Sequence, residues 1–173
     1  MTPRRWYLVS FAAGEDNEFG IAYVINGPAE IGGERDWLMT HAPVRLNLKE
    51  GIVADYLQND VGWALCSGKM RKVIDSVTDE VTWIEAVVLS RDEAIPYYIL
   101  DCQFRPDVVD KRKSKFHGDV LIKRVFDAKA LEAYNVFRCV DDIVGGLCVS
   151  EAVRQQLVDA ECTGVEFDPL PVK

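Results

Sequence analysis

The sequence lacks the patterns by which many catalytic and membrane proteins are recognised. No stretch reaches the ~18 apolar residues of a transmembrane helix. There is no G-x-G-x-x-G, no P-loop and no G-x-S-x-G, so phosphate cradles and hydrolase nucleophile elbows have no support. The five cysteines show neither CxxC nor Cys/His spacing, which argues against a disulfide framework and against a zinc site. We therefore predict no cofactor and no metal, and buried reduced thiols.

Positive charge is also scarce. The 173 residues include 20 Lys and Arg against 28 Asp and Glu, a formal net charge of -8. This balance argues against general affinity for nucleic acid or anionic membranes and favours a basic partner, although solubility alone would explain it. The one basic cluster, Lys111 to Lys115, precedes Phe116. We interpret it as a solvated loop, and a nucleic-acid-binding adaptor is the minority alternative.

Groups able to act as a general base are few. His41 and His117, the only histidines, lie in loop-like segments without a nearby serine or cysteine motif. The enzyme alternative is a small hydrolase that uses Cys66 or Cys148 with His117, because a cysteine near a helix N-terminus can be activated. The acidic pairs 79–80 and 141–142 are interpreted as solvated charges. The sequence thus favours a protein without catalytic activity.

The composition is that of a globular protein, with 49% hydrophobic and 28% charged residues. Basic residues precede an apolar run at the start, as in a secretion signal. The run from Trp6 to Ala13 is short and rich in aromatic and β-branched residues, so we expect a first strand and a cytoplasmic protein. We predict a single domain over 1–173, with a β-rich part over about 1–60.

Several helices and strands follow from local patterns. The runs 4–13 and 19–27 flank a polar turn and predict a hairpin. Glycines and prolines interrupt 29–59, where we expect irregular structure with one short strand or helix. Met70 and Ile74 belong to an apolar stripe behind Ser67, which predicts a capped amphipathic helix. Further predicted segments are strands at 81–90, 95–104, 119–126 and 136–140, and a short helix at 127–135 capped by Asp127.

The C-terminal segment 147–167 is similar to an earlier segment of the same chain. Residues 62–74 align without a gap on 145–157, so that Ser67 falls on Ser150 and Ile74 on Leu157. Both copies predict an apolar lead-in, a serine N-cap, a helix and then a strand. We predict an α+β fold, with two similar Ser-capped helix units packed on a shared, mostly antiparallel sheet and one short extra helix.

Several motifs together resemble a known family. They are the Ser at 67 opening a helix, the strand YYIL at 97–100, Asp110 with Ser114, the Phe-Arg step at 137–138, VSE at 149–151 and T-G-x-x-F at 163–167. In this order, over about 55–172, the sequence resembles the Imm11-type bacterial immunity proteins, found beside polymorphic toxin genes. The segment CSGK at 66–69 departs from the pattern, which has an acid after the serine.

The resemblance implies an immunity protein that binds and neutralises a cognate secreted toxin, such as a basic nuclease domain delivered by type VI secretion, in competition between bacteria. Occlusion needs an interface of about 1,200 Å² and no catalytic group. We expect toxin contacts in the charged loops, at Asp107, Asp110, Lys111, Arg112, Lys113, Asp141 and Asp142. Aromatic residues common in interface hot spots supply further candidates: Trp6, Trp37, Trp63, Trp83, Tyr97 and Tyr98. The oligomeric state is left open.

Overall fold

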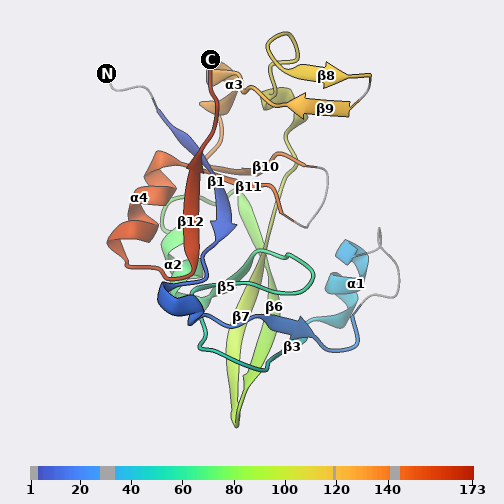
Figure 1. Cartoon of the computed structure of the whole chain (residues 1–173), viewed down its shortest axis with the longest axis vertical. Coiled ribbons are helices and arrows are strands. Elements are labelled where there is room, and N and C mark those ends of the chain that lie inside the picture. The colour runs from blue at the N-terminus through green and yellow to red at the C-terminus, as the bar shows by residue number, and fades with distance from the viewer. Residues whose placement is uncertain (1–3, 28–33, 119, 141–144) are drawn as a thin grey trace.

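A computed structural model describes residues 4–27, 34–118, 120–140 and 145–173 of the chain (Figure 1). One sheet has four antiparallel strands in the order β10-β11-β1-β12. Its strands are β1 (Trp6–Phe11), β10 (Val136–Arg138), β11 (Leu147–Ser150) and β12 (Val165–Pro169). Strand β1 therefore lies inside this sheet, between two strands from the C-terminal part of the chain.

The second sheet has six strands in the order β2-β3-β6-β7-β5-β4. They are β2 (Ala22–Val24), β3 (Val44–Leu48), β4 (Tyr56–Leu57), β5 (Leu65–Ser67), β6 (Val81–Ser90) and β7 (Glu93–Cys102). Only the β3–β6 pairing in this sheet is parallel. Antiparallel pairing dominates both sheets, and the predicted α+β class is confirmed.

The predicted hairpin between the first two strands is wrong. Strands β1 and β2 lie in different sheets, joined through a 3₁₀ turn at Glu15–Asn17, in which Asp16 and Asn17 have positive φ. Strand β1 pairs instead with β11 and β12, and this pairing buries Trp6 to 2% exposure. Burial against distant strands outweighs the local turn, because the turn sequence fixes only the bend and not the partner.

The two predicted capped helices are confirmed. Helix α2 (Gly68–Asp75) begins after Ser67, whose hydroxyl accepts from the N–H of Met70. Helix α4 (Glu151–Asp159) begins after Ser150, whose hydroxyl accepts from the N–H of Val153. Each cap satisfies an N–H that the first helical turn leaves without a partner. The buried stripes have equivalent positions, namely Met70, Ile74, Val153 and Leu157.

The expectation that these helices share one sheet is wrong. Helix α2 follows β5 of the six-stranded sheet, and α4 follows β11 of the four-stranded sheet. The helices pack against each other (Figure 1). Their apolar stripes belong to one core cluster with residues of β1, β7 and β11, including Val9, Leu100 and Val149. The repeated pattern therefore joins two sheets, because each helix has one apolar stripe and the stripes meet.

The remaining elements include helix α1 at one side of the molecule and helix α3 with strands β8 and β9 toward one end (Figure 1). Segment 34–57, predicted to be largely irregular, contains β3, β4 and helix α1 (Glu34–His41), which is additional to the one short extra helix expected. That expected helix is α3 (Ala128–Leu131), with Asp127 as its cap. The predicted strand at 119–126 is present as β9 (Val120–Lys123), which among the strands of the described ranges pairs only with β8 (Lys115–His117). This hairpin stands at the end of the molecule opposite the β6–β7 turn (Figure 1).

Candidate functional site

The thiols named as alternative nucleophiles lie inside the protein. Cys66 on β5 and Cys148 on β11 are fully buried. Burial raises the pKa of the Cys66 thiol, and a hydrogen bond with Cys139, together with burial, raises the pKa of the Cys148 thiol. His117, their proposed base, is exposed on the β8–β9 hairpin. A buried thiol with a raised pKa is a poor nucleophile, because the thiolate is the reactive form. The geometry therefore does not support the predicted cysteine hydrolase.

A different cysteine has the more activated environment. The Cys139 side chain lies 3.2 Å from Nη1 of Arg124. A hydrogen bond from Cys148 lowers the pKa of Cys139 and outweighs the opposing effect of burial, and the Arg124 charge lowers it further. Cys139 is itself 7% exposed, which restricts access to reagents. No sequence pattern predicted the contact between Cys139 and Arg124, because neither residue belongs to a recognisable motif.

The histidine and carboxylate candidates have structural contacts. His41, at the end of α1, stacks on Trp37 with ring centroids 4.5 Å apart. Glu80, expected to be a solvated charge, instead accepts hydrogen bonds from Thr78 and from the backbone N–H groups of Asn135 and Val136. Within the described ranges, no group of three His, Cys, Asp or Glu side chains is arranged to hold a metal ion.

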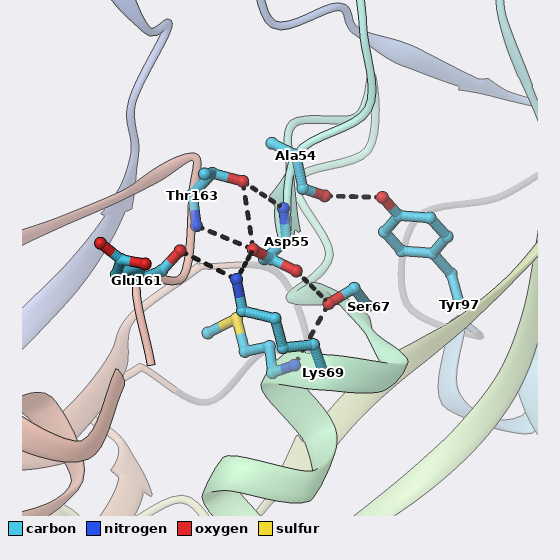
Figure 2. Close-up of polar contacts among 8 residues, drawn as sticks. Ala54, Asp55, Ser67, Lys69, Tyr97, Glu161 and Thr163 are labelled. Atoms are coloured by element: carbon cyan, nitrogen blue, oxygen red, sulfur yellow. Dashed lines mark hydrogen bonds and ion pairs between the residues drawn. The ribbon is translucent and has the colours of Figure 1, made fainter. Parts of the chain in front are cut away.

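The motif residues Ser67 and Thr163 converge on Asp55, which precedes β4 (Figure 2). The Asp55 carboxylate accepts from Ser67 Oγ at 2.6 Å and from the Thr163 N–H at 2.9 Å. Lys69 Nζ lies 3.0 Å from the same carboxylate and also donates to the carbonyl of Glu161 at 2.9 Å. We call Asp55, Ser67, Lys69 and Thr163 the Asp55 clasp. It connects the start of α2 to the loop that follows α4.

The electrostatics of the Asp55 clasp favour the ionised carboxylate. Burial by itself would raise the pKa of Asp55, but hydrogen bonds from Ser67, Thr163 and Lys69, with the Lys69 charge, hold that pKa below its usual value. Gly164 completes the contact with φ near +75°, and a Cβ there would lie 2.5 Å from the Tyr56 carbonyl oxygen. The T-G pair is thus required by backbone approach and by hydrogen bonding.

A second charged cluster explains the Phe-Arg step. Arg138, 7% exposed, donates from Nη2 to Asp101 at 2.6 Å and to the carbonyl of Cys102 at 2.8 Å. The Asp101 side chain is 3% exposed, and its Oδ2 also forms an ion pair with Nη2 of Arg35 at 2.7 Å. The Arg35 side chain itself is 68% exposed. Phe137 is buried completely. This ion-pair cluster joins β7, β10 and α1, which gives the motif a structural role.

The charged loop named as a contact surface is only partly free. Asp107, in the 3₁₀ turn Pro106–Val108, accepts from the hydroxyl of Tyr134 at 3.2 Å. Asp110 accepts from the backbone N–H groups of Arg112 and Lys113 and pairs with the Lys113 ammonium. Lys111, Arg112 and Lys113 are exposed. The two acids and Lys113, which also donates to the Lys173 carbonyl, therefore shape the loop, while Lys111 and Arg112 are exposed to a partner.

The other expected contacts divide between core, partly buried surface and residues outside the described ranges. Trp6, Trp63 and Tyr97 are buried. Trp37, Trp83 and Tyr98 are partly buried. Asp141 and Asp142 lie outside the described residues. The basic loop and the partly exposed aromatics thus remain as candidate contacts.

Exposed apolar side chains concentrate on an element that the contact prediction did not include. On the β8–β9 hairpin, Val120 is 63% exposed, Ile122 60% and Phe116 42%. The base of the hairpin is held by Asp110 N–H donating to the Val125 carbonyl, and by Val125 N–H donating to Ser114 Oγ. These contacts explain why Asp110 and Ser114 belong to the motif: they fix the base of the hairpin, while its strands extend into solvent.

Comparison with models of protein families gives a match over most of the chain. Residues 34–171 match the family model described as Immunity protein family (Imm11). The matched segment includes α1, both capped helices, the Asp55 clasp and the hairpin. A search of curated proteins found none that matches the chain. No helix in the described segments has both the length and the apolar character needed to cross a bilayer.

Proposed function

Because the chain belongs to the Imm11 immunity protein family, we propose that it binds a cognate bacterial toxin and neutralises it by direct occlusion, without catalysis. The family match over 34–171 carries this proposal. The burial of Cys66 and Cys148 supports it, because the cysteine chemistry of the enzyme alternative would need an accessible thiolate.

The proposed biological setting is competition between bacteria. The toxin is encoded beside the immunity gene as part of a polymorphic toxin system and is delivered by neighbouring cells, with type VI secretion as the route. Neutralisation takes place in the cytoplasm, where the delivered toxin would act. An inhibitor of this kind must capture its target before damage occurs, so the association rate matters as much as the affinity.

Net charge supports a basic toxin such as a nuclease domain. A protein with a formal charge of -8 attracts a basic partner, and opposite potentials raise association rates. The test is to measure the association rate at two ionic strengths. The rate should fall several-fold between about 50 and 500 mM salt. A rate that did not change with salt would refute the electrostatic part of the proposal and leave occlusion intact.

The central experiment titrates the toxin domain encoded next to the gene with the purified chain. Occlusion predicts a stable complex and a sharp endpoint at a fixed molar ratio, with the toxin recovered at unchanged mass after dissociation. An enzyme would inactivate the toxin or its product at substoichiometric amounts. Coexpression should restore growth to cells that make the toxin. Absence of both a complex and growth rescue would contradict the proposed function.

A further inference from the structure

The segment 111–124, which includes the β8–β9 hairpin, has a net charge opposite in sign to that of the rest of the chain. Residues 111–124 contain six Lys and Arg and one Asp, which leaves 14 basic and 27 acidic residues, a charge of -13, for the remainder of the 20 and 28. The strands carry Lys115 and Lys123, both exposed. An acidic partner surface would therefore be attracted to this hairpin and repelled by most of the molecule.

The cross-strand pairs on the hairpin are poorly suited to stability. Lys115 is the register partner of Lys123 beside an irregularity in the pairing between Lys115 and Phe116, and like charges that are close across a strand pair destabilise it. His117 lies opposite Val120, which shares its face of the ribbon with Ile122. A two-stranded ribbon is marginally stable in water without packing on one face. The strand pairing alone thus contributes little stability to the hairpin, and covering its exposed apolar side chains with another surface would add to it.

The anchoring of the hairpin limits the entropy lost on docking. The base is fixed by hydrogen bonds among Asp110, Ser114 and Val125, and Val125 itself is buried. A fixed base presents Val120 and Ile122 in one orientation, and preorganisation reduces the conformational entropy that binding must offset. Exposed apolar side chains at the centre of a polar rim are the usual arrangement of a protein interface.

We propose that strands β8 (Lys115–His117) and β9 (Val120–Lys123) form the toxin-docking element, with Val120 and Ile122 seated in an apolar depression and Lys115 and Lys123 facing an acidic rim on the toxin. This inference rests on the proposed function and specifies its contact surface. The rest of the chain outside the docked hairpin has 18 basic and 27 acidic residues, a charge of -9, and is free to attract basic regions of the same toxin.

The test compares two hairpin variants with a matched control against the toxin domain encoded beside the gene. Val120→Ser with Ile122→Ser should raise Kd about 100-fold, since each truncated hot-spot residue changes affinity by about tenfold. Lys115→Glu with Lys123→Glu keeps the like-charge pair within the hairpin and should weaken binding by a similar factor. The control, Met39→Ser with Ile52→Ser, removes apolar side chains that are 66% and 52% exposed elsewhere and should change Kd less than threefold.

The outcomes separate this inference from the proposed function. If the wild-type chain binds the toxin and both hairpin variants bind it with the same affinity, the inference is overturned but the proposed function is not. Absence of toxin binding by the wild-type chain would overturn both. Two other occupants are tested with the same variants: a 20-base-pair DNA duplex, and vesicles of phosphatidylserine and phosphatidylcholine. The inference would be overturned if the hairpin variants lost binding to the duplex or to the vesicles but kept the wild-type affinity for the toxin. It would also be overturned if the wild-type chain formed a dimer that the hairpin variants, and not the control, dissociate.

Discussion

Replacing Asp55 with alanine should destabilise the protein by about 4 kcal/mol. Its side chain is only 14% exposed and accepts charge-assisted hydrogen bonds from Ser67 and Thr163, each worth roughly 1.5–3 kcal/mol. Lys69 is 46% exposed, so its ion pair adds at most about 1 kcal/mol. The donors are neighbours and their contributions do not add fully, which brings the expected total to about 4 kcal/mol.

Thermal and urea unfolding of wild type and Asp55→Ala give the required measurement. For a chain of this size about 4 kcal/mol corresponds to a fall in Tm of roughly 8–16 °C. The control is Asp92→Ala, which removes an exposed carboxylate from the β6–β7 turn and should change stability by less than about 0.5 kcal/mol. A clasp variant as stable as this control would refute the role assigned to Asp55.

The pH dependence of the same site gives an independent check through Asp55→Asn. The folded pKa of Asp55 lies below its unfolded value of 3.8, so ionisation adds stability that is present above pH 3.8. That stability is lost as the pH falls through the folded pKa. The difference in unfolding free energy between wild type and Asp55→Asn should therefore be full at pH 7 and shrink below about pH 4. A difference that grows with acidity would contradict the direction of the shift.

Two other sites give predictions of the same kind. Asp101→Asn should lower the unfolding free energy by about 3–5 kcal/mol, because it leaves Arg138 charged and buried. Arg35→Ala should lower it by no more than about 1 kcal/mol, because Arg35 is mostly exposed. Equal losses of unfolding free energy in urea would refute this contrast. Arg124→Gln should slow alkylation of Cys139 at pH 8, because removal of the cation raises the pKa of that thiol. The measurement is the extent of iodoacetamide labelling of Cys139 by mass spectrometry, and faster labelling in the variant would contradict the prediction.

The sequence was informative where structure is decided locally. The apolar spacing behind Ser67 and Ser150 predicted both helices, because an N-cap and a 3.6-residue period involve only neighbouring residues. The partner of β1 could not be predicted in the same way. Its pairing with β12 depends on residues about 160 positions away, and several strands have suitable apolar patterns. The hairpin error arose from this difference.

The candidate site was predictable only in part. The basic cluster at Lys111 to Lys115 adjoins the proposed docking surface, but the pattern around Val120 and Ile122 predicted only an ordinary strand and not their exposure. Their exposure depends on the absence of a further strand beside β9 within the described part of the chain, which is a property of topology. Asp55 had no signal either, because its partner Thr163 is 108 residues away.

The central position of β1 in the four-stranded sheet has a consequence for synthesis of the protein. Both neighbours of β1 are made last among the described strands, so this sheet cannot close until translation has passed residue 169. Until then the apolar residues of β1 lack their partners in this sheet, and exposed apolar strand residues favour aggregation. Such distant pairing also slows folding. A cell that relies on this protein for protection therefore needs a stock of folded molecules before an attack begins.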